Sequence, residues 1–223
     1  MKILQISDVH SEDNPKFNSY LGNNDLDLVV ITGDITNFGP PEFVTTFIDR
    51  IIALGIKVIA IPGNCDNSES ISAIKSSNAT FNHSSLYIDN NICFYGFGGS
   101  NPTPFDTPFE FDDNEIYENI KPLFGQIVTN QKMFNILVTH APPYGCACDK
   151  IEDGSHVGSN GVRKIIEEFK PDISLCGHIH EANSIDKIGN TVVANPGMLK
   201  NNQGCLIEIA DDFSDFKIEL IEF

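Results

Sequence analysis

Basic residues are scarce in this chain. Lysine and arginine together number 14, against 31 aspartates and glutamates, which gives a formal net charge of −17. An acidic surface of this size repels phosphate backbones, so we do not expect nucleic acid as the main partner. We interpret the charge as that of a solvated surface that keeps the protein dispersed.

Long apolar runs and a basic leader are also missing. The chain opens on a strand-like segment, residues 1–7, without the positively charged start of a signal peptide. It has no run of about 18 apolar residues, which a membrane-spanning helix needs. We therefore expect no signal peptide, no membrane partner and a cytoplasmic location.

No internal repeat and no low-complexity linker divides the chain. Its 223 residues, of which 41% are hydrophobic, are enough for one sizeable core. We expect a single domain over residues 1–223. A homo-oligomer remains open.

The six cysteines do not form a recognisable disulfide or zinc pattern. Cys93, Cys176 and Cys205 lie in apolar, strand-like runs, where cysteine behaves as a small buried hydrophobe. Cys146 and Cys148 are close in sequence, but no second Cys or His pair completes a tetrahedral zinc set. We expect free thiols, as in a reducing compartment.

The apolar pattern predicts alternating strands and helices, then hairpins. Residues 27–32 form a continuous apolar run, typical of a strand covered on both faces, and residues 41–54 have helical spacing. Further helices are expected over 68–77, 113–124 and 161–169. Further strands are expected over 57–61, 86–88, 92–96, 135–139, 173–176, 184–187, 191–194, 205–209 and 216–221. This order favours an α/β fold of two packed sheets with helices outside.

Five short polar motifs directly follow five of these strands. They are Asp8-Val9-His10, Gly33-Asp34, Gly63-Asn64-Cys65-Asp66, Thr139-His140-Ala141-Pro142 and Gly177-His178-Ile179-His180. In sheets built from βα units, ligands bind at the carboxyl ends of the strands. We therefore expect the five loops to converge on one point.

Residues of these motifs are suitable metal ligands. Mn²⁺, Fe²⁺, Zn²⁺ and Co²⁺ accept mixed oxygen and imidazole ligands. Asp8 and His10 are two residues apart, as are His178 and His180, which puts each pair on one side of an extended segment. Asp34 follows a glycine turn and can place one carboxylate between two ions. The pattern predicts two adjacent divalent ions, which make hydroxide at neutral pH and attack phosphorus.

With these motifs in this order, the sequence resembles the calcineurin-like metallophosphoesterase superfamily from Asp8 to Pro196. The resemblance implies a four-layer α-β-β-α sandwich of two mixed β-sheets flanked by helices, the metallo-dependent phosphatase fold. It implies a first metal held by Asp8, His10, Asp34 and His180. It implies a second metal held by Asp34, Asn64, His140 and His178, with Asp34 bridging. Mn²⁺ is the expected ion, with Fe, Zn, Co and Ni as alternatives.

A narrower resemblance concerns three stretches: Thr139-His140-Ala141-Pro142-Pro143, His156-Val157-Gly158-Ser159 and Gly177-His178-Ile179-His180-Glu181. They are similar to a small class III phosphodiesterase branch of the superfamily. This similarity favours phosphodiesters as substrates.

One position departs from the family pattern. Many members have a histidine, thought to protonate the leaving group, where this chain has Cys65. A thiol with an ordinary pKa of about 8.5 is a poorer acid near neutrality than an imidazolium. Metal-bound water, Cys65 itself or a histidine from elsewhere remain open as the proton donor.

Two histidines lie outside the motifs. His83 is in a polar turn and is predicted to lie on the surface. His156 is in a loop that can reach the site, so it either faces the substrate or hydrogen-bonds its own loop. The stretch 105–111, rich in phenylalanine, is either a wall for an aryl or nucleobase group or a cover for the core.

We therefore predict an enzyme that hydrolyses phosphodiester bonds of small substrates through a hydroxide bridging two metals. Asn64 and His156 are the expected phosphoryl-holding residues. The absent histidine donor favours diesters over monoesters. The acidic charge does so too, because a monoester carries an extra negative charge. A phosphomonoesterase or protein phosphatase remains an alternative, as does a non-catalytic protein-binding scaffold of the same fold. A nuclease is disfavoured by the acidic charge.

Overall fold

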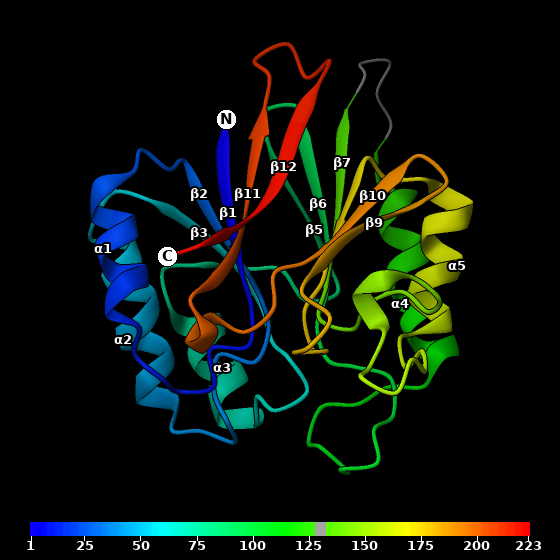
Figure 1. Cartoon of the computed structure of the whole chain (residues 1–223), viewed down its shortest axis with the longest axis horizontal. Coiled ribbons are helices and arrows are strands. Elements are labelled where there is room, and N and C mark those ends of the chain that lie inside the picture. The colour runs from blue at the N-terminus through cyan, green and yellow to red at the C-terminus, as the bar shows by residue number, and fades with distance from the viewer. Residues whose placement is uncertain (128–132) are drawn as a thin grey trace.

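Two mixed β-sheets pack face to face between two layers of helices (Figure 1). The computed structural model describes residues 1–127 and 133–223. Within these ranges each sheet has six strands, in the orders β12-β11-β1-β2-β3-β4 and β5-β6-β7-β8-β10-β9. The predicted α/β sandwich of two mixed sheets with flanking helices is confirmed.

The first sheet has a parallel centre. Its parallel strands are β1 (Lys2–Ile6), β2 (Leu28–Thr32), β3 (Lys57–Ile61) and the short β4 (Thr80–Phe81). On the other side of β1, β11 (Gln203–Ile209) and β12 (Phe216–Glu222) add in antiparallel fashion. Every residue of β2 is buried, as its continuous apolar run predicts.

The second sheet also has a parallel centre, but one antiparallel strand lies at each of its two edges. Its parallel strands are β6 (Ile92–Phe97), β7 (Phe134–Thr139), β8 (Ile173–Leu175) and β10 (Thr191–Asn195). The edges are β5 (Ser85–Asp89) and β9 (Ser184–Ile188). The predicted hairpin of β5 and β6 is confirmed, with Asp89 opposite Ile92.

Helices cover the outer face of each sheet. Over the first sheet lie α1 (Pro15–Asn23), α2 (Pro41–Ile52) and α3 (Ser68–Ser76), and over the second lie α4 (Asp113–Phe124) and α5 (Asn160–Phe169). The short helical turns η1 (Ala147–Asp149) and η2 (Leu199–Asn201) lie in loops. Asn14 caps α1 by accepting a hydrogen bond from the Phe17 amide at 3.0 Å, and Pro15 follows as the first helical residue.

The core forms three layers because neighbouring strand residues face opposite ways. Leu4 and Val29 pack outward against α1 and α2, whereas Ile3, Leu28 and Val30 pack inward between the two sheets. The third layer joins α4 and α5 to the outer face of the second sheet. The two sheets therefore bury both faces, and their parallel strands are rigidly placed relative to each other.

The free thiols that the sequence predicts are confirmed. All six cysteines are free, and five of them are buried, whereas Cys65 is half-buried. Among the described residues, no helix has the length and apolar content that crossing a bilayer demands.

Candidate metal centre

The loops after β1 and β2 are bound to each other through their backbones. The carbonyl of Asp34 accepts from the amides of Val9 and His10 at 2.9 and 3.0 Å, and Asp8 donates its amide to Gly33 at 3.1 Å. Asp8, His10 and Asp34 have φ angles of 54°, 51° and 52°, and His178 has a φ of 71°. Left-handed backbone at four non-glycine residues is strained, and such strain concentrates at functional sites.

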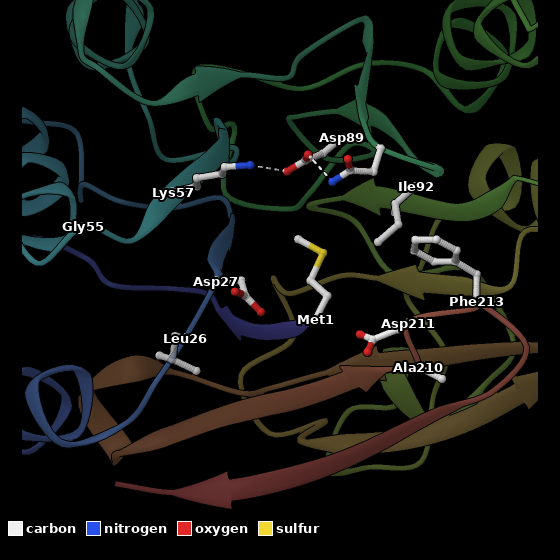
Figure 2. Close-up of a pocket in the computed structure, with 11 residues that line it drawn as sticks. Met1, Leu26, Asp27, Gly55, Lys57, Asp89, Ile92, Ala210, Asp211 and Phe213 are labelled. Atoms are coloured by element: carbon white, nitrogen blue, oxygen red, sulfur yellow. Dashed lines mark hydrogen bonds and ion pairs between the residues drawn. The ribbon is translucent and has the colours of Figure 1, made fainter.

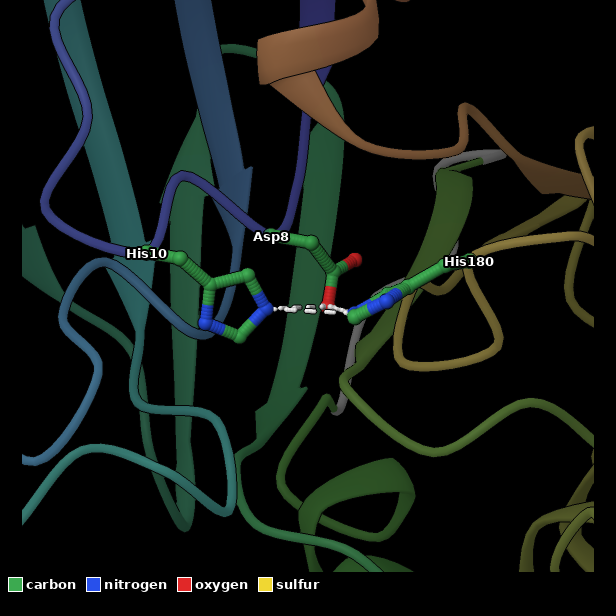
Figure 3. Close-up of side chains that lie close together, drawn as sticks. All are labelled: Asp8, His10 and His180. Carbon is green, nitrogen blue, oxygen red and sulfur yellow. Dashed lines mark hydrogen bonds and ion pairs between the residues drawn. The ribbon is translucent and has the colours of Figure 1, made fainter.

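A first group of ligand atoms comes from Asp8, His10 and His180, which Figure 3 shows meeting from two different loops. Oδ1 of Asp8 lies 3.2 Å from Nε2 of His180, and the Nε2 atoms of His10 and His180 are 3.1 Å apart. Oδ2 of Asp8 accepts from the His178 amide at 3.1 Å, whereas the buried Oδ1 has no hydrogen-bond partner. A carboxylate oxygen and two imidazole nitrogens at these spacings fit one divalent cation.

A second group surrounds Asp34 and His140. The Thr32 carbonyl lies 2.7 Å from Nδ1 of His140, so Nδ1 carries the proton and donates it. The Nε2 of the same ring faces Oδ1 of Asn64 at 2.8 Å and Oδ2 of Asp34 at 3.5 Å. In a neutral ring these are three lone pairs aimed at one another, an arrangement that a bound cation satisfies.

Asp34 lies between the two groups. Its Oδ2 is 3.8 Å from Nε2 of His10 and 3.5 Å from Nε2 of His140. Its Oδ1 accepts from the Cys65 amide at 2.8 Å, which holds the carboxylate in place. One carboxylate facing both histidines matches the bridging position that the sequence predicts for Asp34, and the donor set as a whole fits two ions.

The amide of Asn64 is oriented by the Phe-rich loop. Its Nδ2 donates to Oγ1 of Thr107 at 2.9 Å, and the Thr107 hydroxyl in turn donates to Oε1 of Glu110. Because Thr107 gives its only proton to Glu110, it can act only as an acceptor toward Asn64. The Asn64 oxygen must therefore turn toward His140 and the metal site. Thr107 and Glu110 have no signal in the sequence that marks this role.

Two glycines of the motifs are required by close approach. A Cβ at Gly63 would lie 2.0 Å from Oδ1 of Asp34, and a Cβ at Gly177 would lie 1.9 Å from Oγ of Ser7 and 2.8 Å from Oδ2 of Asp8. A side chain at either position displaces a carboxylate of the site. The glycines that precede Asn64 and His178 are therefore part of the site's construction.

Burial and mutual charge shift the ionisation of the site. Burial alone lowers the pKa of His140, but the Asp34 and Asp8 carboxylates raise it to about 9. Burial alone raises the pKa of Asp34, but His140, His10 and the Cys65 amide hold it well below its usual range. Burial and the charge of His140 lower the pKa of His178 to about 4. His178 is therefore neutral at pH 7, as a metal ligand must be.

The structure brings together most of the predicted ligands. Asp8, His10, Asp34, His140 and His180 belong to groups whose potential ligand atoms lie within 4.8 Å of one another, and Asn64 adjoins His140. The His178 ring lies edge-on to the His140 ring, with centroids 5.0 Å apart. His178 is thus beside the second group, although it is not among those close clusters of described residues.

His156 is held by its own loop. Its Nδ1 donates to Oδ1 of the buried Asp149 at 2.6 Å, and Asp149 also accepts from the amides of Gly145, Cys146 and Gly158. The neighbouring Val157 lines the cavity beside the metal site, whereas His156 does not. No signal in the sequence marks Asp149 as the residue that orients His156.

Cys65 and Asp66 have different surroundings. The sulfur of Cys65 forms a close group with His10 and Asp34, and burial and Asp34 raise the pKa of the thiol. The buried Asp66 carboxylate accepts from the amides of Ile35, Thr36 and Gly63. Asp66 therefore binds the loops after β2 and β3 to each other.

The prediction for His83 is wrong. Its Nδ1 accepts from the Gly98 amide at 2.9 Å, and its ring packs among Phe81, Phe97, Phe109 and Phe111. This aromatic packing makes the ring half-buried, although the adjacent sequence is polar. The Phe-rich stretch is also divided, because Phe109 and Phe111 cover this cluster whereas Phe105 is 80% exposed.

A cavity of about 550 Å³ adjoins the metal site. It is lined by Asn101, Pro102, Thr103, Pro104, Phe105, Ile151, Val157, His178, Ile179, His180 and Glu181. Since His178 and His180 belong to the predicted ligand set, a molecule in this cavity lies directly beside predicted metal ligands.

A second cavity, of about 510 Å³, lies where the parallel strands begin, between the start of β1 and the β11–β12 turn (Figure 2). Its Lys57 ammonium pairs with Asp89 at 2.6 Å, and the Met1 amino group donates to the Ile209 carbonyl at 2.8 Å. Its cationic groups are thus engaged by the protein. The groups of potential metal ligands found among the described residues all lie at the strands' carboxyl ends instead.

Known proteins resemble this chain over most of its length. An uncharacterized protein of Methanocaldococcus jannaschii is 41% identical over 202 residues, which cover 88% of each chain. A probable cyclic nucleotide phosphodiesterase of Vesicomyosocius okutanii is 24% identical and covers 87% of this chain and 84% of its own length. A probable glycerophosphodiester phosphodiesterase of Arcobacter nitrofigilis is 23% identical, with coverages of 98% and 85%.

The fold is shared with solved structures. The crystal structure of a Thermus thermophilus protein superposes with a TM-score of 0.76 at 16% identity, covering 99% of this chain and 98% of that one. The calcineurin-like phosphoesterase family profile matches residues 1–182, which contain every predicted metal ligand from Asp8 to His180. Sequence motifs, sandwich fold and converging ligand atoms agree with this match, and the chain belongs to the calcineurin-like phosphoesterase family.

Proposed function

We propose that this protein hydrolyses phosphodiester bonds of small substrates with the help of two divalent metal ions. The observation that carries the proposal is the convergence of Asp34, Asn64 and His140. In this buried site Nε2 of His140 faces Oδ1 of Asn64 at 2.8 Å and Oδ2 of Asp34 at 3.5 Å. These acceptors need a positive charge between them, which a proton on His140 supplies in the metal-free protein and a divalent ion would supply in its place.

In this proposal each ion has four ligands from the chain. Asp8, His10, Asp34 and His180 hold the first ion, and Asp34, Asn64, His140 and His178 hold the second. When bound, a pair of divalent ions supplies a nucleophilic hydroxide at neutral pH and neutralises charge on the phosphoryl oxygens. Mn²⁺ is the ion we propose first, with Fe, Zn, Co and Ni as alternatives.

The chain's own residues orient the reaction. Asp34 and the Thr32 carbonyl hold the His140 ring, and Thr107 holds Asn64. One hydrogen of Asn64 Nδ2 faces Thr107, and the weaker contact of Nδ2 with the Cys65 sulfur, at 3.7 Å, is the one a phosphoryl oxygen would replace. His156, whose Nδ1 is engaged by Asp149, would contact the phosphoryl group through Nε2.

Three observations favour diesters over monoesters. Cys65 stands where a histidine donor is expected, and the surrounding carboxylates and burial keep its thiol protonated and weakly acidic. The net charge of −17 disfavours the dianionic monoester. Two relatives carry phosphodiesterase names, one for cyclic nucleotides and one for glycerophosphodiesters.

We further propose a cytoplasmic location.

The test is the hydrolysis of bis(p-nitrophenyl) phosphate and p-nitrophenyl phosphate by metal-stripped protein with Mn²⁺ added back. We expect turnover of the diester only when metal is present, and its loss in Asp34→Asn and His140→Ala. Asp25→Asn is the matched control, because it removes one carboxylate from an exposed position outside the site.

Preference for the monoester would replace the phosphodiesterase proposal with a phosphomonoesterase. Full activity in both Asp34→Asn and His140→Ala would exclude the proposed site. Two tightly bound ions without hydrolysis of either ester would favour the protein-binding scaffold.

A further inference from the structure

Apolar side chains from two parts of the chain line the cavity beside the metal site. Pro102, Pro104 and Phe105 come from the loop after β6, and Ile151, Val157 and Ile179 come from the loops after β7 and β8; we call these two sets its walls. His178 and His180, which belong to the predicted ligand set, also line the cavity. A volume of about 550 Å³ is in the range of sites that enclose small organic ligands. The cavity therefore has room for an organic group attached to a phosphoryl centre.

The charge of the lining selects among such groups. Among the described residues that line the cavity, Glu181 carries the single carboxylate, and none of the eleven is lysine or arginine. A second phosphate or carboxylate on the substrate would meet Glu181 without a compensating cation. The group that fits is consequently uncharged.

The wall that carries Phe105 is braced by Glu110. The Glu110 carboxylate accepts from the amide and hydroxyl of Thr103, at 3.2 and 2.6 Å, and from the amide of Thr107 at 3.0 Å. The Thr103 hydroxyl also accepts from the Phe105 amide at 3.2 Å. The Phe105 ring, whose backbone is anchored in this network, is 80% exposed and lines the cavity, so a molecule bound there can cover it.

A hydrogen bond joins the two walls. Nδ2 of Asn101 donates to the carbonyl of Val157 at 3.1 Å, which ties the loop of Phe105 to the loop that follows η1. The same loop reaches the metal site through Thr107 and Asn64. Cavity and metal site therefore have a fixed relative position, as a substrate that spans both requires.

We propose that this cavity binds an uncharged aromatic ester group of the substrate, an aryl ring or a nucleobase, with Phe105 as its stacking surface; the proposal rests on the phosphodiesterase function above. Phe105 is a specificity-determining residue, since it contacts the ester group and not the phosphorus. An alkyl ester group leaves the walls uncovered and is the poorer substrate.

The kinetic test compares phenyl p-nitrophenyl phosphate with methyl p-nitrophenyl phosphate, which share a leaving group. We expect Phe105→Ala to lower kcat/KM for the phenyl ester about five- to tenfold and to leave the methyl ester nearly unchanged. Phe38→Ala is the matched control, because Phe38 is 54% exposed but does not line the cavity. Equal effects of Phe105→Ala on both esters, or an equal effect of Phe38→Ala, would overturn the proposal.

A binding measurement separates this proposal from the proposed function. Phenylphosphonate and methylphosphonate have C–P bonds that a phosphoesterase does not hydrolyse, so their affinities for Mn²⁺-loaded protein can be measured by calorimetry without turnover. We expect tighter binding of phenylphosphonate, and loss of the difference in Phe105→Ala. This result without hydrolysis of any ester would support the cavity and reject the phosphodiesterase. Hydrolysis of both diesters with equal affinity for the two phosphonates would support the phosphodiesterase and reject the aromatic-binding cavity.

Discussion

The Thr107 hydroxyl accepts a hydrogen bond from Asn64 Nδ2 at 2.9 Å while it donates its own proton to Glu110. This pair connects the wall of the cavity to a predicted metal ligand. The direction of the two hydrogen bonds determines which end of the Asn64 amide faces His140, because a hydroxyl has one proton to give. We therefore expect metal binding to depend on a loop that supplies no predicted ligand.

We predict that Thr107→Val weakens metal binding about tenfold or more. Valine has a similar shape but no hydroxyl, so Asn64 loses the partner that orients its oxygen. Thr107→Ser keeps the hydroxyl and should bind metal almost like the parent chain. Titration of Mn²⁺, followed by the electron paramagnetic resonance of the free ion, measures both affinities. Equal affinity of Thr107→Val and the parent chain would contradict this role.

His140 makes metal binding dependent on pH. Its pKa of about 9 means that the metal-free protein holds a proton on Nε2 at neutral pH, and a metal ion must displace that proton. We expect the affinity for metal to rise with pH up to about 9, by as much as about tenfold per pH unit. Calorimetry in buffers of different ionisation enthalpy should detect about one proton released at pH 7. Binding without proton release between pH 7 and 8 would argue against a protonated His140.

The stability of the metal-free protein should fall as the pH rises, in contrast to the affinity for metal. Because the pKa of His140 is raised in the folded protein, its protonation stabilises the fold fully below the ordinary histidine pKa of 6.5. This contribution is lost as the pH rises toward about 9. The pKa of His180 is also raised, so its contribution to the stability is likewise lost as the pH rises. His178, with a pKa lowered to about 4, instead reduces stability as the pH falls below 6.5. Urea unfolding of metal-free protein at pH 6.5 and 9 should therefore show lower stability at pH 9.

Gly63→Ala should damage both the fold and the site. The added Cβ would lie 2.0 Å from Oδ1 and 2.3 Å from the amide nitrogen of Asp34, so the two loops must separate. We expect a loss of about 2–4 kcal/mol in the free energy of unfolding together with impaired metal binding. Gly22→Ala, in α1 with no atom within 4 Å of the added Cβ, should instead stabilise the protein by about 0.5 kcal/mol. Denaturant unfolding of both variants checks the contrast, and similar changes in the two would refute it.

His156 and Asp149 should separate catalysis from stability. A third of the His156 side chain is exposed, so His156→Ala should change the free energy of unfolding by less than about 1 kcal/mol. If His156 holds the phosphoryl group, kcat should fall about 100-fold. Asp149→Asn should instead cost about 2 kcal/mol or more, because the buried carboxylate accepts three backbone amides. An unchanged kcat in His156→Ala would leave His156 a residue of its loop only.

Local patterns in the sequence predicted most of the fold. The apolar run of β2, the helical spacing of α2 and the hairpin of β5 and β6 depend on neighbours within one or two turns, so they can be recognised without a structure. The alternation of strands and helices implies a helix between residues 7 and 27 but gives it no bounds, and it does not predict the two-residue β4, since each carries a weak apolar signal. The surface prediction for His83 fails because its immediate neighbours are polar, whereas Phe97 and Phe109, which help to cover it, come from other parts of the chain.

The sequence by itself determined which residues end the strands, and therefore which side chains belong to the metal site. Strand ends and glycine turns are local features, so each motif and its place in the chain can be recognised without a structure. Only the tertiary structure decided that Thr107 orients Asn64, that Asp149 holds His156, and that Phe105 separates from Phe109 and Phe111. Thr107 and Asn64 are far apart along the chain. These arrangements arise from the packing of two sheets and from the need of buried polar groups for partners, which no single segment can satisfy.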